Sequence, residues 1–98
     1  MTHAGLRTRA CELFGVEHPI VQTGMGWVAG ARLTSVTSAA GGLGILASAT
    51  MTTPQLQAAI REVTERTDKP FGVNLRSDQP DIDDRIELLI RAKVKVAS

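Results

Sequence analysis

The residues of this chain best suited to chemistry are the glycines of a short segment, GMGWVAG, that follows an apolar run. Gly24, Gly26 and Ala29 match the GxGxxG/A spacing of a strand-to-helix turn that binds a dinucleotide pyrophosphate. Such a site also needs an Asp or Glu about 20 residues further on to hold a ribose hydroxyl. No acidic residue lies between Glu17 and Glu62. We therefore favour a second interpretation, in which the two glycines let a flat ligand lie against the backbone at a strand end.

A second glycine cluster, GGLG at 41–44, comes after a predicted helix and before a predicted strand. A phosphate-binding loop needs the reverse order, because the amides of a helix N-terminus must face the anion. The cluster therefore predicts the end of a helix and a tight turn into the strand.

The remaining titratable side chains form no recognisable catalytic or metal-binding set. No group of His, Cys and carboxylate residues has the spacing of metal ligands. The acidic residues of 81–84 begin a predicted helix, where capping and the helix dipole are enough to explain them. Cys11 is the single cysteine, which excludes an internal disulfide, and we interpret it as a packing residue. We predict no catalytic residue and no metal site in this segment.

Apolar periodicity predicts strands and helices in strict alternation. In chain order the predicted elements are a helix at 6–14, a strand at 18–22, a helix at 29–40, a strand at 43–48, a helix at 53–66, a strand at 70–75, a helix at 80–93 and a strand at 94–98. In the helix at 29–40 we expect Leu33, Val36 and Ala40 to share one side. In the helix at 53–66 we expect Thr53 to be the cap and Pro54 to lie in the first turn.

This alternation, with apolar strands, predicts an α/β fold with a parallel sheet. The strands recur at roughly 23 to 27 residues, close to the unit of a (β/α)8 TIM barrel of about 250 residues. Residues 1–98 are thus predicted to be the N-terminal segment of one incomplete barrel domain, with about the first three to four βα units. The alternative is an open sheet with an exposed last strand, which allows a homo-oligomer.

Composition excludes several partners. The net charge of +1 and the three aromatic residues give no basis for binding nucleic acid. No apolar run approaches the roughly 18 residues of a membrane span. The single cysteine and the lack of a signal-peptide pattern predict a cytoplasmic setting.

Three motifs in order, HPIVQTGMG, AAGGLGIL and DKPFGVNL, resemble the N-terminal part of the nitronate monooxygenase family of FMN-dependent TIM barrels. The resemblance covers residues 10–98 and about a third of a family barrel. It implies that the backbone of Thr23, Gly24 and Met25 lies against the flavin ring and that the side-chain amide of Asn74 hydrogen-bonds it. Gly24 stands where the family often has proline.

The resemblance implies an FMN-dependent oxidoreductase that acts on a small-molecule substrate. The first hypothesis is oxidation of alkyl nitronates with O2. The second is reduction of unsaturated acyl or coenzyme A thioesters, as in steroid breakdown, with NAD(P)H as electron donor. A non-enzymatic alternative is an inactive truncated barrel fragment. The family's catalytic histidine is expected after the fourth strand, beyond VKVAS.

Overall fold

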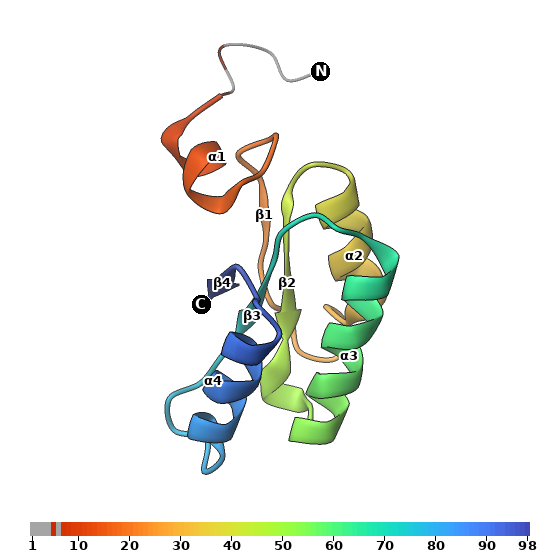
Figure 1. Ribbon diagram of the computed structural model, residues 1–98, viewed down its shortest axis with the longest axis vertical. Coiled ribbons are helices and arrows are strands. Elements are labelled where there is room, and N and C mark those ends of the chain that lie inside the picture. The colour runs from red at the N-terminus through yellow and green to blue at the C-terminus, as the bar shows by residue number, and fades with distance from the viewer. Residues whose placement is uncertain (1–4, 6) are drawn as a thin grey trace.

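A four-stranded parallel sheet in the order β1-β2-β3-β4 forms the centre of the computed structural model, which describes residue 5 and residues 7–98 (Figure 1). The elements are α1 (Arg9–Phe14), β1 (Val21–Gln22), α2 (Ala31–Ala39), β2 (Leu43–Ala47), the 3₁₀ turn η2 (Ser48–Thr50), α3 (Thr53–Arg66), β3 (Phe71–Asn74), α4 (Ile82–Arg91) and β4 (Val96–Ala97). The predicted order of strands and helices and the parallel sheet are confirmed.

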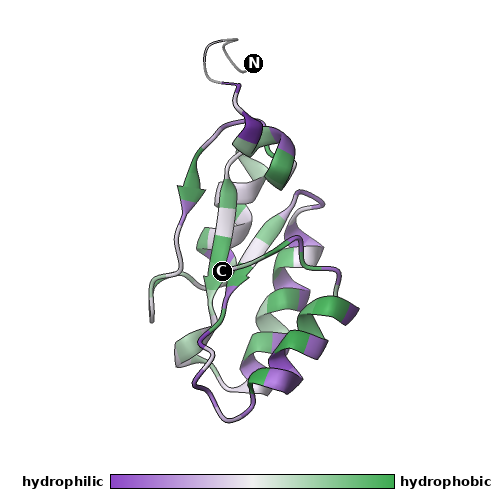
Figure 2. Cartoon of the chain, turned by 90° about the vertical axis from the view of Figure 1, so that its left-hand side faces the viewer, coloured by the Kyte–Doolittle hydropathy of each residue, from purple (hydrophilic) through white to green (hydrophobic). Residues whose placement is uncertain are grey.

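The central strand β2 is buried on both faces, as its continuous apolar run predicted. On one face Leu46 packs with side chains of α3 and α4, among them Leu56 and Leu89. On the other face Leu43 and Ile45 pack against Val16 and Phe14 at the end of α1. Figure 2 shows the hydrophobic colour running along the strands. Packing on both faces holds β2 in place. Because the strands are parallel, the carboxyl ends of β1, β2 and β3 lie at the same edge of the sheet.

The strands are shorter than predicted, and β1 and β4 are reduced to two residues each. Pro19 has no N–H to give to a ladder, and the amide of His18 donates instead to the carbonyl of Gly41, at 2.9 Å. Pairing of β1 with β2 is thus confined to Val21 with Leu43 and Gln22 with Gly44. Gly41 has φ 105° and ends α2 in a tight turn, so the helix-end interpretation of the GGLG cluster is confirmed.

The buried face of α2 differs from the prediction. Val36 is 60% exposed, whereas Thr34, Ser35 and Ser38 are buried. The reason is the close approach of the helix to β2 at Gly44, where an added Cβ would lie 2.3 Å from the carbonyl oxygen of Thr34. The hydroxyl of Ser38 also accepts a hydrogen bond from the Gly44 amide, at 3.0 Å. Small side chains are needed in this contact, so the expected apolar side of α2 was wrong.

The N-cap of α3 lies one residue earlier than predicted. The side chain of Thr52, not Thr53, accepts a hydrogen bond from the Gln55 amide at 3.2 Å. The Gln55 side chain accepts in return from the Thr52 amide at 2.9 Å, which completes a capping box. Pro54 lies in the first turn, as expected. The displaced Thr53 hydroxyl is then available for another contact, described below.

Candidate functional site

The loop between β1 and α2 folds over the carboxyl ends of β2 and β3. A Cβ added to Gly24 would lie 3.0 Å from the Cβ of Asn74 and 3.5 Å from the Cα of Ala47. The amide of Ala47 donates to the carbonyl of Ala29 at 3.0 Å, which fixes the far end of the loop. The structure thus brings together Gly24 and Asn74, two residues that the sequence assigns to one flavin ring.

Asn74 is the last residue of β3 and pairs in register with Ala47 of β2. Its carbonyl oxygen accepts a hydrogen bond from the hydroxyl of Ser48. Its half-buried side-chain amide makes no hydrogen bond to any other described residue. The hydrogen bond that a turn-forming Asn makes to its own backbone is not seen, so the amide is able to donate and accept elsewhere.

Thr23 and Met25 flank Gly24 and are both exposed. The Met25 carbonyl accepts from the amides of Val28 and Ala29, at 3.0 and 2.7 Å, so the loop is a closed turn rather than a free strand. Contact of Thr23, Gly24, Met25 and Asn74 with a flavin stays a prediction. The donor set suits the group, since a glycine backbone and an open amide face the same edge of the sheet.

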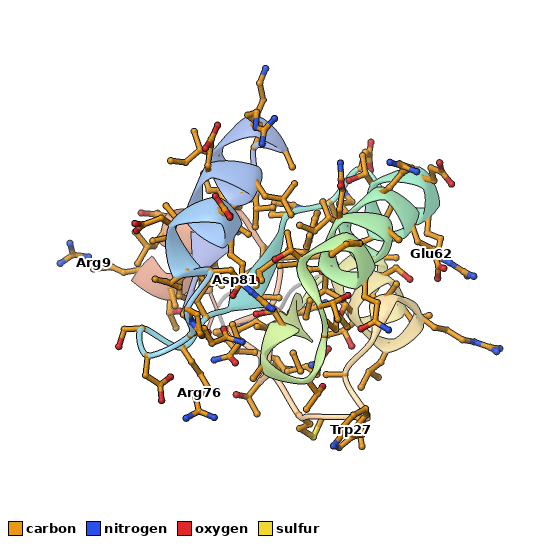
Figure 3. All side chains as sticks on the ribbon, turned by 90° about the horizontal axis from the view of Figure 1, so that it is seen from below. Arg9, Trp27, Glu62, Arg76 and Asp81 are labelled. Atoms are coloured by element: carbon orange, nitrogen blue, oxygen red, sulfur yellow. The ribbon has the colours of Figure 1, made fainter. Side chains whose placement is uncertain are left out.

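Trp27 does not pack as a helix-start aromatic usually does. It is 88% exposed, has φ 66°, and points away from the body of the chain in Figure 3. A left-handed φ is rare in a residue other than glycine and concentrates at functional sites. Trp27 borders a cavity of about 350 Å³ beside the loop, lined also by Val28, Ala29, Gly30, Ala47, Thr50, Met51 and Gln55.

Gln22 ends β1 and turns its side chain to the neighbouring strand. Its Nε2 donates to the carbonyls of Ile45, at 3.1 Å, and Thr23, at 2.6 Å. These bonds extend the hydrogen bonding between β1 and β2 by one step past the last residue of β1. Polar side chains at strand ends commonly act in this way. Its buried Oε1 has no hydrogen-bond partner in the described part of the chain.

A buried cation behind the site was missed from the sequence. The side chain of Arg85 on α4 is 5% exposed. Its guanidinium donates to the carbonyls of Ser48 and Met51 at 2.7 and 2.6 Å, and to Asp81 Oδ1 at 3.0 Å. The other oxygen of Asp81 accepts from the Thr53 hydroxyl. Asp81 therefore does not serve its helix as a side-chain cap, and its main role is to pair with Arg85. The one usable signal was the i, i+4 spacing of Asp81 and Arg85.

These contacts hold the pKa of Asp81 below its ordinary value of 3.8, first through the Thr53 hydroxyl and then through Arg85. The lowered folded-state pKa means that the pairing stabilises the fold fully above the unfolded value and loses this effect as pH falls through the folded pKa.

We therefore expect Asp81→Asn to flatten the decrease in melting temperature between about pH 5 and pH 3. Thermal unfolding across that range is the measurement. Asp83→Asn changes an exposed carboxyl in the same helical turn and is the control. Identical pH profiles for wild type and Asp81→Asn would contradict the linkage.

Among the described residues, no group of three or more His, Cys, Asp and Glu side chains could hold a metal ion. His18 lies beside Gly41 at the amino end of the sheet, opposite the loop. No helix among the described residues is long and apolar enough to cross a membrane.

Comparison with known proteins gives one consistent family. The model of the nitronate monooxygenase family matches residues 7–97. A (3aS,4S,5R,7aS)-5-hydroxy-7a-methyl-1-oxo-octahydro-1H-indene-4-carboxyl-CoA dehydrogenase of Mycobacterium tuberculosis is 68% identical over 95% of this chain and 26% of the relative. A nitronate monooxygenase of Pseudomonas aeruginosa is 42% identical over 74% of this chain and 20% of the relative.

Among solved structures, FabK from Thermotoga maritima superposes with a TM-score of 0.88 at 44% identity, over 93% of this chain and 29% of FabK. The predicted α/β fold, a partial TIM barrel, is thereby confirmed. The chain spans about a quarter of the length of the curated relatives, 26% for the dehydrogenase above.

Proposed function

The chain belongs to the nitronate monooxygenase family. We propose that it forms the surface that contacts one face of the flavin ring in an FMN-dependent oxidoreductase acting on a coenzyme A thioester. The observation that carries the substrate class is the 68% identity to a dehydrogenase named for a CoA thioester, against 42% to a named nitronate monooxygenase. This reverses the order of the two hypotheses drawn from the sequence. Residues 1–98 are then one part of a single barrel domain.

The residues of this chain would bind and orient the cofactor. The backbone of Thr23, Gly24 and Met25 would lie along one face of the ring, because the lack of a side chain at Gly24 lets the loop lie close against Ala47 and Asn74 at the strand ends. The amide of Asn74 would hydrogen-bond a polar edge of the ring, which suits a group that both donates and accepts. FMN, when bound, supplies the hydride or electron transfer.

Nitronate oxidation is the second candidate, supported by the family match over residues 7–97 and by the Pseudomonas relative. Two experiments on the encoded protein separate the two: anaerobic mixing with a CoA thioester, and mixing with an alkyl nitronate in the presence of O2. Flavin reduction or oxidation by the thioester alone supports the proposal. Turnover of the nitronate alone, with O2, contradicts it.

Asn74→Ala is expected to weaken FMN binding about 10-fold, the effect of one or two lost hydrogen bonds. Titration of the apoprotein by flavin fluorescence quenching measures it. Gln57→Ala removes an exposed amide on α3 and is the control. Equal affinity for wild type and Asn74→Ala would show that this amide does not hold the ring.

A further inference from the structure

The guanidinium of Arg85 links α4 to η2, the turn that follows β2. Its Nη1 and Nη2 donate to the carbonyls of Ser48 and Met51, one at each end of η2. The planar fork of a guanidinium holds two such carbonyls in a fixed geometry, whereas a lysine ammonium is a compact charge on a flexible stem and does not fix their relative positions. The first turn of α3 follows directly, so the fork sets where α3 begins.

Asp81 and Thr53 complete the cluster and keep the cation neutralised. Nε of Arg85 donates to Asp81 Oδ1, and Thr53 donates to the second oxygen. In Figure 3, Asp81 lies inside the outline of the chain between the starts of α4 and α3, whereas Arg9, Arg76 and Glu62 point outward. A buried cation with its anion and two carbonyls is a satisfied arrangement that fails if one member is removed.

One residue, Ser48, connects the cluster of Arg85, Asp81 and Thr53 to the proposed ligand site. The carbonyl of Ser48 accepts from Arg85, and the hydroxyl of the same serine donates to the carbonyl of Asn74. The Asn74 Cβ in turn limits how closely Gly24 can approach. Met51, at the other end of η2, lines the cavity beside Trp27. Displacement of η2 would therefore shift both Asn74 and the cavity wall.

We propose that Arg85 is a positioning residue that fixes η2 and, through Ser48, sets the place of Asn74 at the ligand site. Its donors point at backbone carbonyls and it is nearly inaccessible, so it does not itself contact substrate. The flavin part of this inference rests on the proposed function. The part that concerns η2 does not.

The test compares wild type, Arg85→Lys and two controls in the full encoded protein. Hydrogen exchange by mass spectrometry is followed for peptides over 48–52 and 72–75, and FMN affinity is measured by titration. Arg91→Lys is a surface control on the same helix, since the Arg91 side chain is 71% exposed. Leu89→Val trims the core side of α4 and leaves the hydrogen bonds of Arg85 in place, and so controls for lower stability alone.

For Arg85→Lys we expect amide hydrogen exchange at 48–52 to be at least about 10-fold faster. We expect FMN binding to be about 10-fold weaker, which is a loss of about 1.4 kcal/mol in binding free energy. Neither control should produce both changes. Unchanged exchange at 48–52, or the same pattern in Leu89→Val, would overturn the positioning role. Faster exchange with unchanged FMN affinity would overturn the link to the ligand site.

The failure of the proposed function gives a different result. If wild type binds no FMN while Arg85→Lys still speeds exchange at 48–52, the flavin assignment is wrong and the positioning of η2 stands. If Arg85→Lys does not fold, Asp81→Asn provides the measurement, because the single amide oxygen can still accept from Arg85 while the bond from Thr53 is lost. We expect a smaller, severalfold increase in exchange for it, and no increase would contradict the proposal.

Discussion

Gly44→Ala is expected to lower the free energy of unfolding by about 3 kcal/mol, the upper part of the range for an overfilled core. The added methyl would lie 2.3 Å from the carbonyl oxygen of Thr34 and 2.9 Å from its Cα. Both atoms belong to the backbone of α2, so no side-chain rotation can relieve the clash. The whole helix would have to move away from β2.

Denaturant unfolding of the two proteins measures this change. Gly30→Ala is the matched control, since an added Cβ there meets no atom within 4 Å and the backbone is extended, at φ −89°. Because Gly30 is the N-cap of α2, its free energy of unfolding should fall by no more than about 1 kcal/mol. A loss for Gly44→Ala no larger than that of the control would mean that α2 can shift freely on the sheet.

Gly24→Val is expected to weaken FMN binding about 100-fold, or about 2.7 kcal/mol. The Cβ alone would lie 3.0 Å from that of Asn74, and the branched methyls need more space than the strand ends leave. The loop must then lift from β2 and β3, and a displacement near 1 Å at a binding surface can cost two orders of magnitude.

Flavin titration and thermal unfolding, done on the same preparations, separate lost binding from lost folding. Ala39→Val adds bulk at an exposed position in the last turn of α2, away from the loop, and should bind FMN as wild type does. If Gly24→Val folds and keeps wild-type affinity, the ring does not lie on this loop, and the assignment of Thr23 and Met25 fails with it.

Local patterns predicted the order of elements well, because each element satisfies its own periodicity. The apolar run of β2 and the apolar stripe of α3 each meet a buried surface in the fold. The pairing of Gly24 with Asn74 at one edge also follows from parallel strands whose carboxyl ends coincide. The family resemblance supplied what periodicity cannot, namely the cofactor expected there.

The two largest misses, the buried face of α2 and the burial of Arg85, share a physical cause, since each depends on a contact outside its own helix. The polar inner face of α2 follows from Gly44, 10 residues beyond Thr34, and hydrophobicity alone selects the wrong side. From the sequence alone, Arg85 is expected to be a solvated residue on a helix surface. In the fold, its guanidinium lies beside the carbonyls of Ser48 and Met51. Charged side chains are almost never buried without partners, and those partners lie 37 and 34 residues away.

The strand order β1-β2-β3-β4 has a consequence for how the protein is made. Each strand pairs with the one synthesised just before it, as Val21 with Leu43 and Gly72 with Val96. A growing chain can therefore add one βα unit at a time to a sheet already outside the ribosome, without waiting for a distant partner. Until the next unit arrives, the newest strand exposes an open edge, and that interval is when a nascent chain of this topology most needs a chaperone.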